Sequence, residues 1–151
     1  MSTPTLQERL GQEIKAAMLA RDADRLGVLR MLKSALGYVL IERKAEALPD
    51  ADFISLVQKE IKKRRDSIAQ FESGGRPELA ARELQEAVVL ETFLPTALTA
   101  EELEALVRGV IAELGATSKK DMGPVVKATQ ARAAGRADGK SISSLVGKLL
   151  P

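Results

Sequence analysis

The sequence predicts an all-α protein built from two helical subdomains. Apolar residues recur at intervals of three and four along most of the chain, two segments open with a T-x-x-E capping box, and Gly or Pro separates most consecutive segments. Little in the pattern suggests strands. The segments group into an N-terminal four-helix portion over residues 1–95 and a smaller C-terminal three-helix portion over residues 96–151.

The first two helices are predicted by their caps. Thr5 and Glu8 form a capping box, and the helix that follows ends near Arg21. Its apolar positions are Leu6, Leu10, Ile14, Ala17 and Met18. Asp22 can cap the next helix, whose apolar residues cover nearly half of its circumference, so we expect a central position for it. These residues are Leu26, Val28, Leu29, Leu32, Leu36, Val39 and Leu40.

The third and fourth helices lie between Pro49 and Pro95. Asp50 or Asp52 can cap the third helix, which ends at residues 73–75, a Ser-Gly-Gly turn. Its expected apolar stripe is Ile54, Val57, Ile61, Ile68 and Phe71. Pro77 suits the first turn of the fourth helix, because no intrahelical N–H is needed there. The expected apolar positions of that helix are Leu79, Leu84, Ala87, Val88 and Leu94.

The helical pattern stops at residues 93–95, Phe-Leu-Pro, which predicts the subdomain boundary. Thr99 and Glu102 form the second capping box, and Gly115 closes the fifth helix. The expected apolar positions of this helix are Leu103, Leu106, Val107, Val110, Ile111 and Leu114.

Two further helices follow. Ser118 or Asp121 can cap the sixth, and with Asp121 as the cap Pro124 falls in its first turn. Residues 135–139, Gly-Arg-Ala-Asp-Gly, interrupt the pattern before a short last helix. A portion of only about 56 residues makes a marginal core, so we expect it to depend on the first portion.

Composition excludes several kinds of chemistry. The 151 residues include no Cys and no His, which removes thiolate nucleophiles, Ser-His-Asp relays and the usual ligands of zinc and haem, so we expect no metal and no cofactor. No apolar run approaches the roughly 20 residues that span a bilayer, and no secretory signal precedes the first helix, so we expect no membrane partner and a cytoplasmic location.

Positive charge is concentrated from Gly115 to the end, where 37 residues contain seven basic and two acidic side chains. The seven are candidate nucleic-acid-binding residues: Lys119, Lys120, Lys127, Arg132, Arg136, Lys140 and Lys148. Because the region holds no aromatic residue, contacts to phosphates and to the shape of a folded RNA are favoured over base stacking. A moderately basic solvated surface is the alternative.

Two other motifs are better explained by structure. Residues 59–65 contain five basic residues, but helical geometry spreads them around the helix and lets Glu60 pair with Arg64, which favours a solvated face. Gly139-Lys140-Ser141 is one residue short of a phosphate-binding loop counted from Gly135, so a glycine turn before a helix is favoured.

Several short runs, in their order and spacing over nearly the whole chain, strongly resemble the YqeY family. They are Ala16–Met18, Arg21-Asp22, Leu26–Lys33, Lys62–Ile68, Gly75-Arg76, Phe93–Pro95, Asp121–Gly123 and the loop of Gly135, Arg136, Ala137, Asp138 and Gly139. The resemblance implies two all-α subdomains. It also implies a C-terminal part similar to the tail of the GatB subunit of the tRNA-dependent amidotransferase.

Three hypotheses follow for function. The first is a non-catalytic accessory module that binds tRNA, or a tRNA-enzyme complex, through the seven basic residues. The second is a helical protein–protein interaction adaptor, with a groove between the subdomains for a partner helix. The third, least favoured, is a glutamine-dependent carbon–nitrogen ligase, a label that the resemblance carries but that these residues do not support for the chain alone. We predict no catalytic residue.

Overall fold

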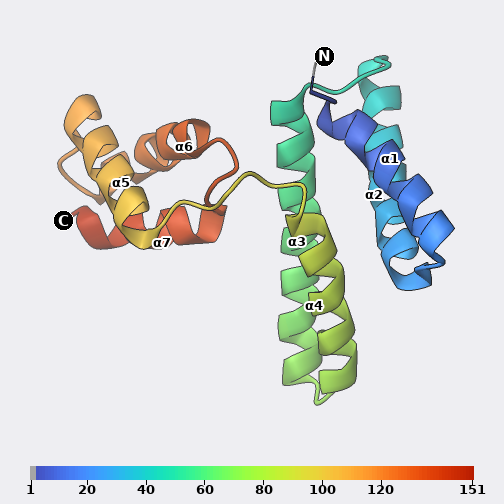
Figure 1. Cartoon of the computed structure of the whole chain (residues 1–151). Coiled ribbons are helices and arrows are strands. Elements are labelled where there is room, and N and C mark those ends of the chain that lie inside the picture. Colours follow the sequence, from blue (N-terminus) through green and yellow to red (C-terminus); the bar gives the residue numbers. More distant parts are fainter. Residues whose placement is uncertain (1–2) are drawn as a thin grey trace. The chain divides into compact units, whose positions relative to one another are not determined.

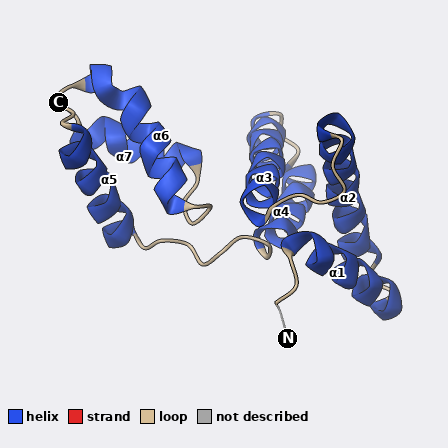
Figure 2. Ribbon diagram, turned by 90° about the horizontal axis from the view of Figure 1, so that it is seen from above, coloured by secondary structure: helices blue, strands red, loops and turns tan. Residues whose placement is uncertain are grey.

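The computed structural model describes residues 3–151, and every regular element among them is helical (Figure 2). The elements in chain order are α1 (Leu6–Ala20), α2 (Ala23–Arg43), α3 (Asp50–Ser73), α4 (Pro77–Glu91), α5 (Ala100–Leu114), the 3₁₀ helix η1 (Lys119–Asp121), α6 (Met122–Ala133) and α7 (Gly139–Leu149). The all-α prediction is confirmed.

Contacts within the chain divide it into two compact units, with the division between Leu94 and Pro95. We call residues 1–94 the N-terminal unit and residues 95–151 the C-terminal unit. Helices α1 to α4 belong to the first and α5 to α7 to the second (Figure 1). That residues 1–95 and 96–151 are separate domains stays a prediction.

Local capping signals place the ends of α1 and α2. The Thr5 hydroxyl accepts a hydrogen bond from the Glu8 backbone N–H at 3.1 Å, and the Glu8 carboxylate accepts one from the Thr5 N–H. The chain leaves α1 through Arg21, which adopts a left-handed conformation with φ of 56°. The Asp22 carboxylate then accepts from the Arg25 N–H, so both predicted caps are confirmed.

The predicted cap of α3 is wrong. Pro49 stands at the N-cap position, and no side chain caps the helix. Asp50 and Asp52 lie inside the first turn, so their carboxylates reach neighbouring helices instead. The Asp50 carboxylate accepts from the Leu6 N–H at 3.0 Å, and the Asp52 carboxylate lies 2.9 Å from the Arg43 guanidinium.

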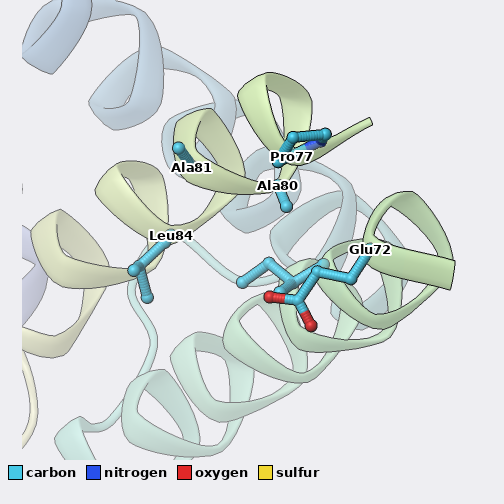
Figure 3. Close-up of a pocket in the computed structure, with 6 residues that line it drawn as sticks. Glu72, Pro77, Ala80, Ala81 and Leu84 are labelled. Carbon is cyan, nitrogen blue, oxygen red and sulfur yellow. The ribbon is translucent and has the colours of Figure 1, made fainter. Parts of the chain in front are cut away.

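The buried face of α4 also differs from the prediction. Leu84 and Val88 are exposed, with 56% and 54% of their surface accessible, whereas Ala80, Ala87 and Leu90 are buried. Apolar residues surround most of this helix, so spacing alone does not select the face. The buried positions thus include two alanines, whereas these two bulkier side chains stay at the surface. Figure 3 shows Ala80 and Leu84 beside a hollow of about 220 Å³.

The core of the N-terminal unit contains two residues of α3 that the predicted stripe omits, Phe53 and Leu56, alongside the expected Val57 and Ile61. Ile68 and Phe71 are only partly buried and lie outside this core cluster. The rings of Phe53 and Phe93 lie 5.9 Å apart, a separation that favours aromatic contact.

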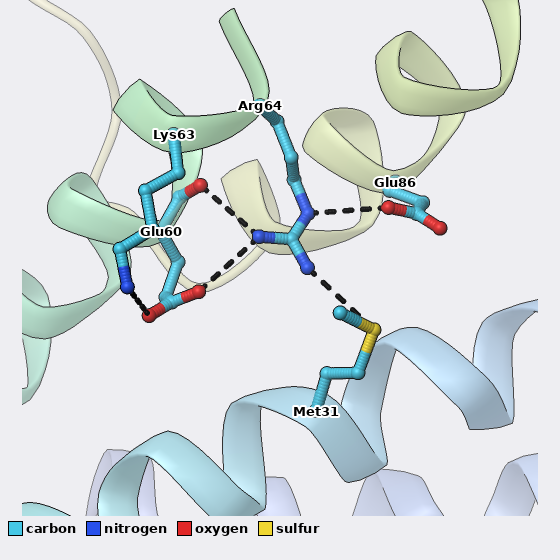
Figure 4. Close-up of polar contacts among 5 residues, drawn as sticks. All are labelled: Met31, Glu60, Lys63, Arg64 and Glu86. Atoms are coloured by element: carbon cyan, nitrogen blue, oxygen red, sulfur yellow. Dashed lines mark hydrogen bonds and ion pairs between the residues drawn. The ribbon is translucent and has the colours of Figure 1, made fainter. Parts of the chain in front are cut away.

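A charged side chain is part of this core. Only 6% of the Arg64 side chain is exposed, and its guanidinium joins three helices (Figure 4). It donates to the Glu60 backbone carbonyl and carboxylate, lies 3.4 Å from the Glu86 carboxylate of α4, and lies 3.8 Å from the Met31 sulfur of α2. The other basic residues of 59–65 are exposed and form a solvated face. Arg64 differs from them because it links three helices.

The C-terminal unit has its own apolar cluster between α5, α6 and α7. Its fully buried residues are Val107, Val110, Val125, Ile142 and Val146. The capping box of Thr99 and Glu102 is confirmed, and the chain leaves α5 through Gly115 with φ of 65°. Within residues 3–151, none of the helices is both long and apolar enough to cross a membrane.

The start of α6 departs from prediction. Ser118 caps η1 rather than the α-helix. Asp121 stands at the N-cap position of α6 but makes no cap there, because its carboxylate accepts hydrogen bonds from the Thr117 and Ser118 N–H groups. Pro124 lies in the first turn of α6, as predicted.

Candidate nucleic-acid interface

The seven predicted basic residues lie on every element of the C-terminal unit after α5. Six are exposed and Arg136 is half-buried. Lys119 and Lys120 belong to η1, Lys127 and Arg132 to α6, and Lys140 and Lys148 to α7, with Arg136 in the turn before α7.

Arg136 holds the turn in place. Its Nε donates to the Thr96 carbonyl at 2.8 Å, and its own carbonyl accepts from the Leu98 N–H at 2.8 Å. Its guanidinium also lies 4.0 Å from the Glu102 carboxylate. The side chain therefore ties residues 134–138 to the segment that leads into α5, which is a structural task.

Three other residues of the predicted 135–139 loop, Gly135, Asp138 and Gly139, also have structural roles. Gly135 has φ of 84°, a left-handed conformation that costs glycine little. The Asp138 carboxylate accepts from the Ser141 N–H at 2.8 Å and so caps α7. Gly139 begins α7, where a Cβ would lie 3.2 Å from the Gln130 side-chain nitrogen. This geometry favours a helix-starting turn over a phosphate loop.

Arg132 is also engaged within the unit, by an ion pair with Glu113 of α5. Sequence reasoning missed both arginine partners, because Glu102 and Glu113 are distant along the chain. No local signal points to them.

Five lysines remain available. They are exposed, and no ion pair joins any of them to an acid within the described part of the chain: Lys119, Lys120, Lys127, Lys140 and Lys148. Acidic residues of this unit are concentrated on α5, at Glu101, Glu102, Glu104 and Glu113. Charge is thus separated between α5 and the elements that follow it.

The structure brings only some of these lysines together. The Lys119 N–H donates to the Pro151 carbonyl at 3.2 Å, which sets η1 beside the residues that follow α7. Lys148 lies in the last turn of α7, so Lys119, Lys120 and Lys148 belong to one end of the unit. Lys140 lies in the first turn of α7, and an 11-residue helix is about 16 Å long. Lys140 therefore lies about 12 Å along the helix from Lys148, so the five lysines do not all lie at one end of the unit.

Two acids near the start of α5, Glu102 and Glu104, have structural roles. The Glu102 carboxylate accepts a hydrogen bond from the Thr99 backbone N–H, which holds the pKa of that carboxyl below its usual range; the Thr99 side chain and the Arg136 charge act in the same direction. Glu104 pairs with Arg108 at 2.9 Å. Over residues 3–151, no group of three acidic side chains is placed to hold a metal ion.

Residues 7–150 match the model of the Yqey-like protein family. Over 108 residues the chain is 33% identical to the "Altered inheritance of mitochondria protein 41, mitochondrial" of Kluyveromyces lactis, which covers 70% of this chain and 58% of that protein. The protein of the same name from Eremothecium gossypii is 31% identical over 111 residues, which cover 72% of this chain and 60% of that protein.

The chain thus matches less than two thirds of the length of these two relatives. The family match, by contrast, extends over both units of the structure. The chain belongs to the Yqey-like protein family.

Proposed function

We propose that this chain is a non-catalytic accessory module that binds tRNA through the C-terminal unit. The observation that carries the proposal is the set of five exposed lysines without an acidic partner on η1, α6 and α7. Phosphate oxygens are the natural partners of such lysines, since binding releases the counterions of the nucleic acid.

The chemistry of the unit favours phosphates over bases. No Phe, Tyr or Trp follows Phe93 in the sequence, so no ring is available for stacking. Recognition of a folded RNA by its shape and backbone suits this composition. The resemblance of this part to the GatB tail makes tRNA the RNA to test first.

The contacts within the unit decide which residues to replace in a test of tRNA binding. Arg132 and Arg136 make contacts within the unit, so their substitution would change stability as well as binding. Lys120 and Lys148 are free of such contacts and belong to the same end of the unit. The test variant is therefore Lys120→Glu with Lys148→Glu. Its matched control is Lys59→Glu with Lys62→Glu, which changes net charge equally on exposed positions of α3.

The experiment is fluorescence anisotropy of total tRNA across a salt series. With about five phosphate contacts, affinity should fall about 10² to 10³-fold between 50 and 200 mM salt. The Lys120→Glu, Lys148→Glu variant should bind more weakly, with a log–log salt slope reduced by roughly 1.4 to 1.8. The control should bind as the unchanged protein does. Equal affinity for all three proteins would refute the proposal.

The cytoplasmic location stays a prediction, because the relatives compared above carry the word mitochondrial in their names. The adaptor hypothesis, with its groove between the subdomains, also stays a prediction.

A further inference from the structure

The N-terminal unit carries an apolar groove between α1 and α2, the two helices that run side by side in Figure 1. The hollow has a volume of about 260 Å³. Its floor consists of apolar and glycine residues from both helices: Leu10, Gly11, Ile14, Leu36, Gly37 and Leu40. We call it the α1–α2 groove.

Two glycines line this groove. Gly11 and Gly37 lie in the interiors of α1 and α2, and a Cβ built on either would meet no atom within 4 Å. Neither has a positive φ, so the helix does not need glycine for its backbone conformation. Glycine is among the poorest helix formers, and its presence here leaves room for another molecule to approach both backbones closely.

Exposed apolar side chains extend the floor in both directions. Met18 follows Gly11 by seven residues and is 51% exposed, and Ile41 follows Gly37 by four residues and is 77% exposed. Residues separated by four or seven lie on the same face of a helix. The apolar surface therefore runs along most of α1, a helix of 15 residues and about 22 Å.

The sides of the groove are basic. Counted from Gly37, the same face of α2 carries basic residues four and seven positions before it, and Lys15 follows Gly11 by four on α1. We call these three residues the basic rim: Lys15, Arg30 and Lys33. All three are exposed, and none forms an ion pair with any residue that the structure describes.

Acidic residues are almost absent from these faces. Glu8 precedes Gly11 by three, and its carboxylate is already bonded to the Thr5 N–H in the capping box. On α2, counting positions three, four and seven residues from Gly37 finds no acid. The rim thus presents three positive charges to a ligand against one carboxylate that is already engaged.

We propose that the α1–α2 groove binds an amphipathic α-helix of a protein partner, with its apolar stripe on the groove floor and Asp or Glu side chains on both sides of the stripe. The length, the apolar floor and the glycine-lined approach fit a helix of about four turns. The unpaired rim charges specify acidic flanks. An RNA backbone would leave the apolar floor uncovered. The inference concerns the other unit and stands independently of the RNA proposal.

The experiment is a selection with the full-length protein. The probe is a display library of helical peptides of about 16 residues, or about 24 Å, with Leu and Ala on one stripe and a free choice of Glu, Lys or Ser beside it. We expect the selected peptides to carry Glu at the flanking positions. On binding, they should shift the amide resonances of Gly11 and Gly37 in NMR spectra.

Variants then locate the binding. Gly37→Leu fills the groove and should weaken the selected peptides at least about tenfold, the loss typical of a central interface position. Lys15→Glu with Lys33→Glu should weaken them by a similar factor. Gly27→Ala is the matched control, because its Cβ also meets nothing within 4 Å, and Gly27 lies outside the groove lining, ten residues or about 15 Å along α2 from Gly37.

Four outcomes would overturn the proposal. They are the absence of any selected binder, selected peptides without an acidic bias, binding unchanged in Gly37→Leu, and shifts of the Gly11 and Gly37 amides caused by tRNA or by a second copy of the chain in place of the peptide. Circular dichroism of each variant checks that the helices are intact.

Discussion

Replacing Arg64 by Leu removes the guanidinium that joins α2, α3 and α4. The change leaves the Glu60 and Glu86 carboxylates, whose side chains are 12% and 21% exposed, without their shared partner. Breaking one side of a buried ion pair typically costs about 3–5 kcal/mol. Because Glu86 keeps some access to water and Leu fills part of the volume, we expect a loss of about 3 kcal/mol, at the lower end of that range.

The neighbouring residue provides the control. Lys63 also pairs with Glu60, at 3.2 Å, but 72% of its side chain is exposed. An exposed pair contributes about 0–1 kcal/mol, so Lys63→Leu should change stability by less than about 1 kcal/mol. The two substitutions remove one positive charge each from adjacent positions, and they differ mainly in burial.

Urea unfolding followed by circular dichroism measures the two losses. The result that supports the reasoning is a large loss for Arg64→Leu, a small one for Lys63→Leu, and partial recovery when Glu60→Gln and Glu86→Gln are added to Arg64→Leu. Equal losses for Leu at positions 63 and 64, or a more stable Arg64→Leu variant, would show that the buried ion pairs do not hold these helices together.

Three further predictions address glycines, a cap and a turn. Gly11→Ala with Gly37→Ala should stabilise the N-terminal unit by about 1–2 kcal/mol in the same unfolding assay. Each Ala adds about 0.4–1 kcal/mol at a helical position with free space. A destabilised variant would mean that the groove closes in solution. The pKa of Glu102 is lowered, so its stabilising effect is complete above the ordinary carboxyl pKa of about 4.3 and is lost as pH falls through the lowered value. Glu102→Gln should therefore reduce stability at pH 7 and have no effect in acid. A difference in stability between the two proteins that does not depend on pH would contradict this. Arg136→Ala should cost about 1 kcal/mol by loss of the bond to the Thr96 carbonyl, whereas Lys140→Ala should stay within about 0.5 kcal/mol, and urea midpoints that coincide for the two would refute the structural role of Arg136.

The predicted helix ends succeed where the signal is local. A capping box needs only four consecutive residues, so Thr5 with Glu8 and Thr99 with Glu102 specify their helix starts without help from the rest of the chain. Asp22 and Gly115 are similar cases. These signals account for the confirmed all-α class.

The errors lie where a distant residue decides. The Asp50 carboxylate accepts a hydrogen bond from the N–H of Leu6, 44 residues earlier, and does not cap its own helix. Arg64 is buried because acids from α3 and α4 meet its guanidinium. On α4, Ala80 and Ala87 are buried and Leu84 and Val88 are exposed, a difference that periodicity cannot predict on a helix that is apolar on most sides.

The partners of the arginines in the candidate interface could not be predicted from the sequence for the same reason. Composition identifies the basic excess after Gly115, but Arg132 and Arg136 reach acids of α5 that precede them by at least 19 residues. Arginine forms such ties more readily than lysine, because its planar guanidinium matches a carboxylate or carbonyl in a fixed geometry. The lysines, whose charge is a strongly hydrated point, remain at the surface.

The same division between paired and unpaired charge gives the two proposals distinct tests. In the N-terminal unit, Arg9, Arg25 and Arg43 pair with acids, whereas the basic rim of the α1–α2 groove does not. The rim surrounds an apolar floor, and the lysines of η1 and α7 do not. Binding to the groove should therefore survive high salt better than binding to the lysines, because apolar burial is not screened by ions. A variant with Gly37→Leu should keep tRNA binding and lose the helical peptide, and one with Lys120→Glu and Lys148→Glu should do the reverse.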